Sequence, residues 1–152
     1  MRNVWCGVVI IAAMFVGEQA SAADGCTVSV EAGGVGFGSF NPLTDLPRDT
    51  IGHIHYNCTN VGNIWIDLSK GYSSSYARFM KSGTKELLYN LYLDEAHATI
   101  WGDKSVGTDH YATATPPSNG VDVDVSVHGN IPVQQNISAG TYTDTIQVTI
   151  TF

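Results

Sequence analysis

The stretch TDTIQVTITF, residues 143–152, decides the fold of this chain. Its apolar residues Ile146, Val148, Ile150 and Phe152 alternate with polar ones, and a period of two is typical of a strand with one buried face. Because no further strand follows in the sequence, we expect the sheet that holds this strand to have an open edge beside it. An open edge offers unpaired backbone groups to another chain, which favours function through assembly over function through catalysis.

The first 22 residues have the features of a secretory signal peptide. Arg2 supplies a positive charge, residues 8–16 form a short apolar run, and residues 20–22 (ASA) form a small-residue cleavage site. The run is too short to cross a bilayer comfortably and no second apolar segment follows, so we expect export without membrane insertion. Cleavage would leave residues 23–152, a length that suits one domain.

The charge of the chain disfavours nucleic acid as a partner. The formal net charge is −7, and loss of Arg2 and Glu18 with the signal leaves it unchanged because the two cancel. An acidic chain with few lysines and arginines lacks the positive surface that binds phosphate backbones or anionic membranes.

Two cysteines, Cys26 and Cys58, remain after Cys6 leaves with the signal. In an exported chain such a pair favours one structural disulfide. Closing that loop would contribute about 4 kcal/mol to stability in the chain-entropy model. A metal-binding pair and a catalytic thiol are the alternatives, and they fit less well because an oxidising compartment would trap free thiols.

The rest of the chain consists of short alternating segments separated by turns, which predicts a β-sandwich of immunoglobulin type with about seven strands. The segment 87–93 suits a strand or a helix, and we interpret it as a strand because its neighbours are β-like. The glycines between residues 33 and 38 predict bends or a bulge. The other expected strands are 26–30, 51–58, 63–68 and 121–127, and a loop is expected over 102–120.

Residues with chemical potential do not form a recognisable catalytic pattern. No nucleophile–base motif and no phosphate-binding glycine loop is present, so we do not expect an enzyme or a cofactor. His53 and His55 form an H-x-H pair that could chelate zinc or copper, although two exposed histidines on one strand face are the simpler interpretation. Loop aromatics such as Tyr72 and Trp101 could bind a surface, or could simply plug the ends of a sandwich.

Seven short motifs follow one another along the chain and together cover nearly all of residues 26–152. They are CTV (26–28), GFG (36–38), CT (58–59), RFM (78–80), LYNLY (88–92) followed by Asp94, WGD (101–103) and GTYTDTIQVTITF (140–152). In this order the motifs resemble the spore coat protein U domain family. The domain is similar to pilins of the archaic chaperone–usher pathway and to a secreted coat protein of spore-forming bacteria.

This resemblance implies an incomplete immunoglobulin-like β-sandwich that lacks its last strand and is completed by a donor strand. In such pilins a periplasmic chaperone lends the strand, and an outer-membrane usher helps the N-terminal segment of a neighbouring pilin subunit to replace it. The resemblance also implies that Cys26 and Cys58 form the family's disulfide. The residues expected to contact the chaperone or donor strand are Ile146, Val148, Ile150 and Phe152.

The expected function is therefore that of a structural subunit of a secreted chaperone–usher pilus, serving surface adhesion or biofilm formation. The alternative is a secreted spore-coat or matrix protein, possibly ligand-binding, that forms no fibre. After cleavage only residues 23–25 would precede Cys26, and none is a large apolar residue. A donor strand needs roughly ten residues at about 3.3 Å each, so we expect a tip or terminal position in the fibre.

Overall fold

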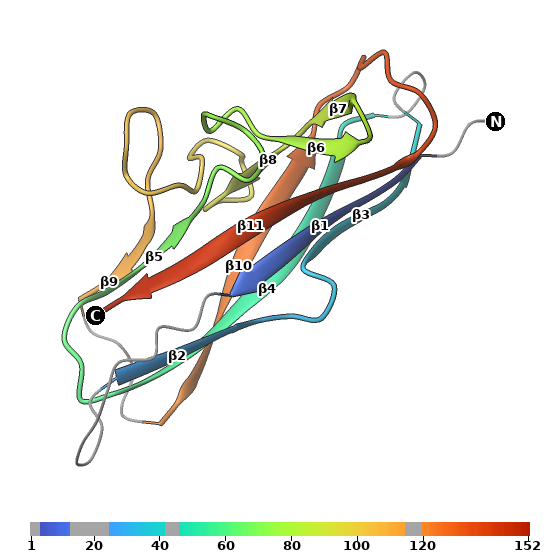
Figure 1. The fold of residues 1–152 in the computed structure, drawn as a ribbon. Helices are drawn as coiled ribbons and strands as arrows, with labels where there is room; N and C mark the ends of the chain where they lie inside the picture. Colours follow the sequence, from blue (N-terminus) through green and yellow to red (C-terminus); the bar gives the residue numbers. More distant parts are fainter. Residues whose placement is uncertain (1–3, 13–24, 42–45, 115–119) are drawn as a thin grey trace.

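The structure is a computed structural model that describes residues 4–12, 25–41, 46–114 and 120–152. Over these ranges the chain forms strands and loops but no helix, and the strands make two sheets that pack on each other (Figure 1). The predicted all-β sandwich is confirmed. The predicted cleavage site at residues 20–22 lies outside the described residues.

The larger sheet has seven strands and holds the C-terminal strand near its centre. Its main path runs β3-β1-β11-β5-β9, while β6 pairs with both β11 and β7. The bounds are β1 (Val4–Ala12), β3 (Val35–Phe40), β5 (Ile64–Leu68), β6 (Phe79–Ser82), β7 (Lys85–Leu88), β9 (Tyr111–Thr113) and β11 (Thr141–Thr151).

The smaller sheet has four strands in the order β2-β4-β10-β8, and its longest pairing is the antiparallel one between β4 and β10. Cys26 lies directly opposite Cys58, and the disulfide between them joins β2 to β4 within this sheet. The predicted disulfide is confirmed. The bounds are β2 (Gly25–Val30), β4 (Arg48–Thr59), β8 (Asn90–Tyr92) and β10 (Asp122–Ile131).

Alternation along the three longest strands of the mature region determines which faces meet in the core. Buried and more exposed positions alternate along each strand, as a period of two requires, and most buried positions hold branched or aromatic residues. Burying these apolar faces is the main favourable term in the packing of the sheets. The buried residues on the three strands include Ile54, Tyr56, Val125, Val127, Ile146 and Val148.

The glycine-rich segment forms strand β3 with an irregularity, as the glycines predicted. The register against β1 shifts between Cys6 and Gly7, and Gly38 has a φ of +68°, which favours glycine. β3 also lies very close to the smaller sheet. A Cβ added to Gly129 of β10 would lie 2.8 Å from both Phe37 and Val35, so only glycine fits there without a shift.

Two expectations from the sequence need correction. The segment 87–93 is not one strand, because the chain leaves β7 in the larger sheet at Leu88 and enters β8 in the smaller sheet at Asn90. Tyr89 makes this crossing, and its hydroxyl is held by a buried partner far along the chain. The expected loop 102–120 contains a three-residue strand, β9, which pairs with β5.

The least expected element is β1, which falls in the region that the sequence assigns to the signal peptide. It lies between β3 and β11 and is the strand that makes the larger sheet continuous (Figure 1). The apolar run was predicted to be a leader alone, and the structure shows that part of it also has a place in the sheet.

Candidate strand-binding groove

The position that β1 occupies is a groove between two strands of the rest of the chain. One wall is β3, which pairs with β1 in antiparallel fashion from Val4 opposite Phe40 to Val8 opposite Val35. The other wall is β11, which pairs in parallel fashion from Trp5 opposite Thr141 to Ala12 opposite Val148. In the absence of β1 both walls would present unpaired backbone N–H and C=O groups along most of their length.

The groove has an apolar floor as well as polar edges. On the β11 wall Tyr142, Ile146 and Val148 are completely buried, and on the β3 wall Val35 and Phe37 are buried. An empty groove would expose part of this core, and burial of each such side chain contributes about 1.5–3 kcal/mol. The groove therefore requires an occupant that supplies both backbone partners and an apolar cover.

Several outer edges of the two sheets offer a shorter template than this position does. β8 and β9 are only three residues long, and short edge strands give little template for another chain. At the end of β7 the Gln135 side chain takes the place of a neighbouring strand, because its amide donates to the Leu88 carbonyl at 2.9 Å and accepts from the Leu88 N–H at 2.7 Å. The outer strands β2 and β3 have six residues each, whereas β11 has eleven, so the side of β11 that faces β1 offers the longest template among these strands.

The four residues predicted to contact a donor strand do not all line the groove. Ile146 and Val148 are buried and lie opposite Ile10 and Ala12 of β1. Ile150 lies beyond the pairing with β1 and is opposite Ile66 of β5 instead.

Phe152 follows the last residue of β11 and is 56% exposed, so its predicted inward orientation is wrong. The pairing of β11 with β5 stops at Thr151, one residue before the terminal ring.

The sequence analysis missed two residues of the β11 wall, Tyr142 and Asp144. Both lie on the inward face, and β1 places Cys6 and Val8 opposite them. The alternation seen at Ile146 and Val148 continues toward the N-terminus through Asp144 and Tyr142. Asp144 obscures this pattern in the sequence because it is polar, although its side chain is 0% exposed.

Asp144 is fully hydrogen-bonded despite its burial. Its carboxylate accepts from the Tyr89 hydroxyl at 2.7 Å and from the Tyr72 backbone N–H at 2.9 Å. Burial raises the pKa of Asp144, and these hydrogen bonds oppose that shift. The Gly71 backbone, at a φ of +65°, lies so close that an added Cβ would collide with the carboxylate. Asp144 thereby fixes the loop after β5 against the groove wall.

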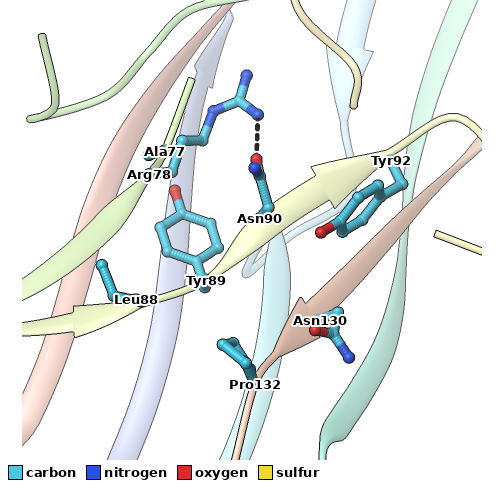
Figure 2. Close-up of a pocket in the computed structure, with 8 residues that line it drawn as sticks. All are labelled: Ala77, Arg78, Leu88, Tyr89, Asn90, Tyr92, Asn130 and Pro132. Carbon is cyan, nitrogen blue, oxygen red and sulfur yellow. Dashed lines mark hydrogen bonds between the residues drawn. The ribbon is translucent and has the colours of Figure 1, made fainter. Parts of the chain in front are cut away.

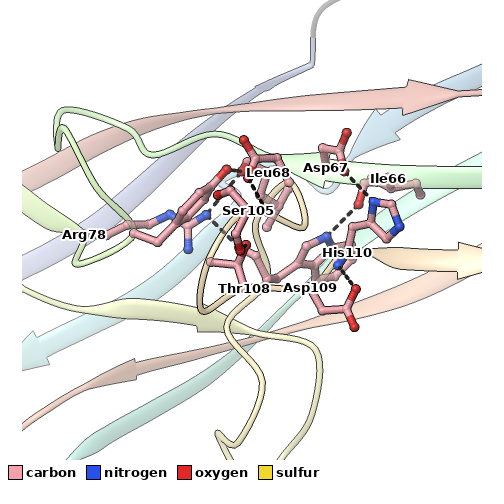
Figure 3. A network of polar contacts seen from close by, with 11 residues as sticks. Ile66, Asp67, Leu68, Arg78, Ser105, Thr108, Asp109 and His110 are labelled. Atoms are coloured by element: carbon pink, nitrogen blue, oxygen red, sulfur yellow. Dashed lines mark hydrogen bonds and ion pairs between the residues drawn. The ribbon is translucent and has the colours of Figure 1, made fainter.

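A buried arginine organises the same end of the sandwich. Arg78 is 0% exposed, and Figure 3 shows its side chain directed toward Leu68 and the neighbouring loops. The guanidinium donates to the Ser69 carbonyl at 3.0 and 2.8 Å, to the Trp101 carbonyl at 2.7 Å and to the Asn90 side-chain oxygen at 2.8 Å. Burial lowers the pKa of Arg78, while Asp144 and nearby tyrosines oppose the shift.

Two aromatic residues complete this polar cluster. The Trp101 indole N–H donates to the Ile66 carbonyl at 2.8 Å, and the Tyr76 hydroxyl donates to the Leu68 carbonyl at 3.0 Å. The Arg78 guanidinium lies 4.9 Å from the centre of the Tyr76 ring, a favourable cation–π distance. Trp101 and Tyr76 are therefore packing residues. Motifs 78–80, 88–92 and 101–103 of the sequence resemblance supply Arg78, Asn90 and Trp101 of this cluster, and Tyr76 lies just before the first of them.

A cavity of about 210 Å³ lies beside Arg78 (Figure 2). Its walls combine apolar side chains with Asn90, Asn130 and the two tyrosines Tyr89 and Tyr92, and they include no serine, cysteine, histidine or carboxylate. The guanidinium is already engaged by Asn90 and by backbone carbonyls, as the dashed line in Figure 2 shows for Asn90. The lining thus offers no nucleophile–base pair.

The H-x-H pair lies on the outer face of the smaller sheet. His53 Nδ1 is 2.8 Å from the Asp124 carboxylate, and the rings of His53 and His55 are stacked 6.4 Å apart. A second histidine–carboxylate pair is formed by His110 and Asp67, with 2.9 Å between His110 Nδ1 and Asp67 Oδ1 (Figure 3). In the described part of the chain no three His, Cys, Asp or Glu residues are grouped so as to hold a metal ion.

In the described residues no helix is long and apolar enough to span a membrane.

Comparison with known proteins connects this geometry to a family. The Spore Coat Protein U domain model matches residues 11–149. Protein U of Myxococcus xanthus is 33% identical over 144 residues, which cover 84% of this chain and 77% of that protein.

Among solved structures, the fold resembles a chain in a complex from Acinetobacter baumannii. That structure is described as a chaperone–tip adhesion subunit pre-assembly complex from archaic chaperone-usher Csu pili. The TM-score is 0.57 at 21% identity, and the match covers 86% of this chain and 40% of the other. At this identity the likeness concerns the fold.

Proposed function

This chain belongs to the Spore Coat Protein U domain family, and we propose that it is a structural subunit of a chaperone–usher fibre that is completed by a strand from a partner. The proposal is supported above all by the groove between β3 and β11. Its occupant, β1, comes from residues that the sequence predicts to be removed on export. The processed domain would then need a strand from another chain.

Physical chemistry favours a strand as the missing partner. The groove has two parallel rows of backbone groups separated by one strand position, and a row of apolar side chains beneath. A donor with alternating apolar residues satisfies both features at once, whereas a helix or a small molecule satisfies neither row completely. The expected partners are a periplasmic chaperone during export, an outer-membrane usher at assembly and neighbouring pilin subunits in the fibre.

The same proposal implies how the protein is exported. The predicted signal directs the chain to the periplasm, where the Cys26–Cys58 bond forms, and the assembled fibre lies at the cell surface. The groove and the lining of the cavity support a role in assembly and offer no constellation that would support an enzymatic role.

Coexpression provides the test. Tagged chain produced in the periplasm with a chaperone of the archaic chaperone–usher type should form a one-to-one complex, and chain produced alone should be aggregation-prone. Ile146→Asp places a charge on the groove wall and should abolish the complex. Gln147→Asp changes the next residue, on the exposed outer face, and should preserve it. A lone processed chain that melts cooperatively at high temperature and ignores the chaperone would contradict the proposal.

A second candidate is a secreted coat or matrix protein that forms no fibre, and the family's description as a spore coat protein domain favours it. In that case the processed chain should be stable and soluble without a chaperone. We also propose a terminal position in the fibre, because the segment before Cys26 is too short to donate a strand. The same material tests this: homopolymers formed by the processed chain alone would contradict it.

A further inference from the structure

We infer that residues 4–12 act as an internal occupant of the groove, so that a chain which keeps its leader is a closed subunit that takes no strand from a partner. This inference rests on the proposed function only for the role of the groove. It adds a second role to the leader, in which removing it opens the assembly site.

The pairing of β1 supports the inference on both sides. β1 satisfies backbone groups of β11 from Thr141 to Val148 and of β3 from Val35 to Phe40. A partner's strand would need the same row of groups, and one strand position cannot hold two strands. Occupation by the leader and occupation by a donor are therefore mutually exclusive.

The composition of the segment explains why it fits. Residues 4–12, VWCGVVIIA, contain no charge and no proline and are rich in β-branched residues, which favour strands. The register sets Ile10 beside buried Ile146 and Ala12 beside buried Val148. An export signal and a groove occupant both require a short uncharged apolar segment, so one sequence meets both requirements.

The short connection between the leader and the domain strengthens the binding of β1 in the groove. Twelve residues, 13–24, separate Ala12 from Gly25 and could span at most about 40 Å if extended. A strand joined by so short a segment is present at an effective concentration in the millimolar range, which exceeds that of any free partner strand. The leader should therefore outcompete a donor of similar sequence until it is cleaved.

The test compares four chains refolded with the Cys26–Cys58 bond formed. Three are full-length and carry Cys6→Ala to prevent mispairing: one without further change, one with Val8→Pro and one with Val16→Pro. The fourth is the processed chain 23–152, which lacks residue 6. The probe is a fluorescent peptide with the sequence of residues 3–13, also with Cys6→Ala. Val8→Pro removes a backbone N–H from the centre of β1, whereas the control Val16→Pro lies beyond β1.

The processed chain should bind the peptide, and the full chain should bind it at least about tenfold more weakly because its own segment competes. Val8→Pro should restore binding and should increase hydrogen exchange at residues 141–148, whereas Val16→Pro should change neither. Equal peptide binding by the full and processed chains would overturn this inference and leave the proposed function standing. Failure of the processed chain to bind any strand peptide or chaperone would overturn the proposed function itself. A full chain that misfolds while the processed chain folds would also overturn the inference.

Discussion

Replacing Arg78 by methionine should be among the most destabilising single changes in this domain. Methionine keeps an unbranched apolar stem like that of arginine, but it lacks the guanidinium group and donates no hydrogen bond. The backbone carbonyls of Ser69 and Trp101 lose the guanidinium donors that reach them at 2.7 to 3.0 Å. The contact with the Trp101 carbonyl is buried and those with the Ser69 carbonyl are partly buried, beside a side chain that is 0% exposed.

The expected loss of stability follows from these two carbonyl acceptors, which are left without a donor. A buried acceptor left without a partner costs about 1–3 kcal/mol, and Asp144 also loses a nearby positive charge. We therefore expect a loss of about 4 kcal/mol, in the range measured for breaking a buried charge network. That is a large fraction of the about 5–15 kcal/mol by which a domain is usually stable.

Urea unfolding of the full chain with its disulfide intact, followed by tryptophan fluorescence, measures this loss. The control is Lys85→Met, which makes the same chemical change at an exposed position of β7 and should alter stability by less than about 0.5 kcal/mol. A loss below about 1 kcal/mol for Arg78→Met, with an unchanged denaturant slope, would show that the two carbonyls find other donors and would refute the reasoning.

Three further predictions concern neighbouring features. Gly71→Ala should cost about 2–4 kcal/mol because its Cβ meets the Asp144 carboxylate, whereas Gly83→Ala, with a similar positive φ and open space, should cost about 1–2 kcal/mol in the same urea assay. Burial raises the pKa of Asp144 above its ordinary 3.8, so the folded chain binds this proton more tightly than the unfolded chain. This carboxyl should therefore add stability as pH falls from neutral toward about 4, and Asp144→Asn should remove that component from the pH dependence of the urea midpoint. Intact mass of the exported protein should correspond to a chain beginning at Ala23 and lacking two hydrogens, and reduction of the bond should lower stability by about 4 kcal/mol, whereas two free thiols in periplasmic material would contradict the assignment.

The long strands could be predicted because their alternation is imposed by a single buried face. Segment 51–58 lies within β4, and segments 121–127 and 143–152 each extend only one residue beyond the observed strands β10 and β11. The short strands could not, because tertiary contacts decide them. β9 is held by its pairing with β5, and the break at Tyr89 depends on a hydrogen bond to Asp144, 55 residues away.

Only part of the groove could be predicted from the sequence. Ile146 and Val148 follow from alternation, but Tyr142 was not included because Asp144 interrupts the apolar pattern after it. An aspartate at an inward position signals a polar network, and its partners Tyr89 and Tyr72 lie too far away in sequence to be paired with it. β1 was missed for a different reason: an apolar run near the N-terminus is read first as a leader, and the two roles require the same composition.

The disulfide has a consequence for the order of maturation. Cys26 and Cys58 enclose β3, so one wall of the groove lies on a covalent ring, whereas the other wall, β11, lies outside it. If oxidation comes first, β3 stays tethered close to the smaller sheet even while the groove is empty. If a strand binds before oxidation, β3 is not yet held close to the smaller sheet by the disulfide. Formation of the disulfide before strand binding therefore leaves β3 better positioned for the incoming strand.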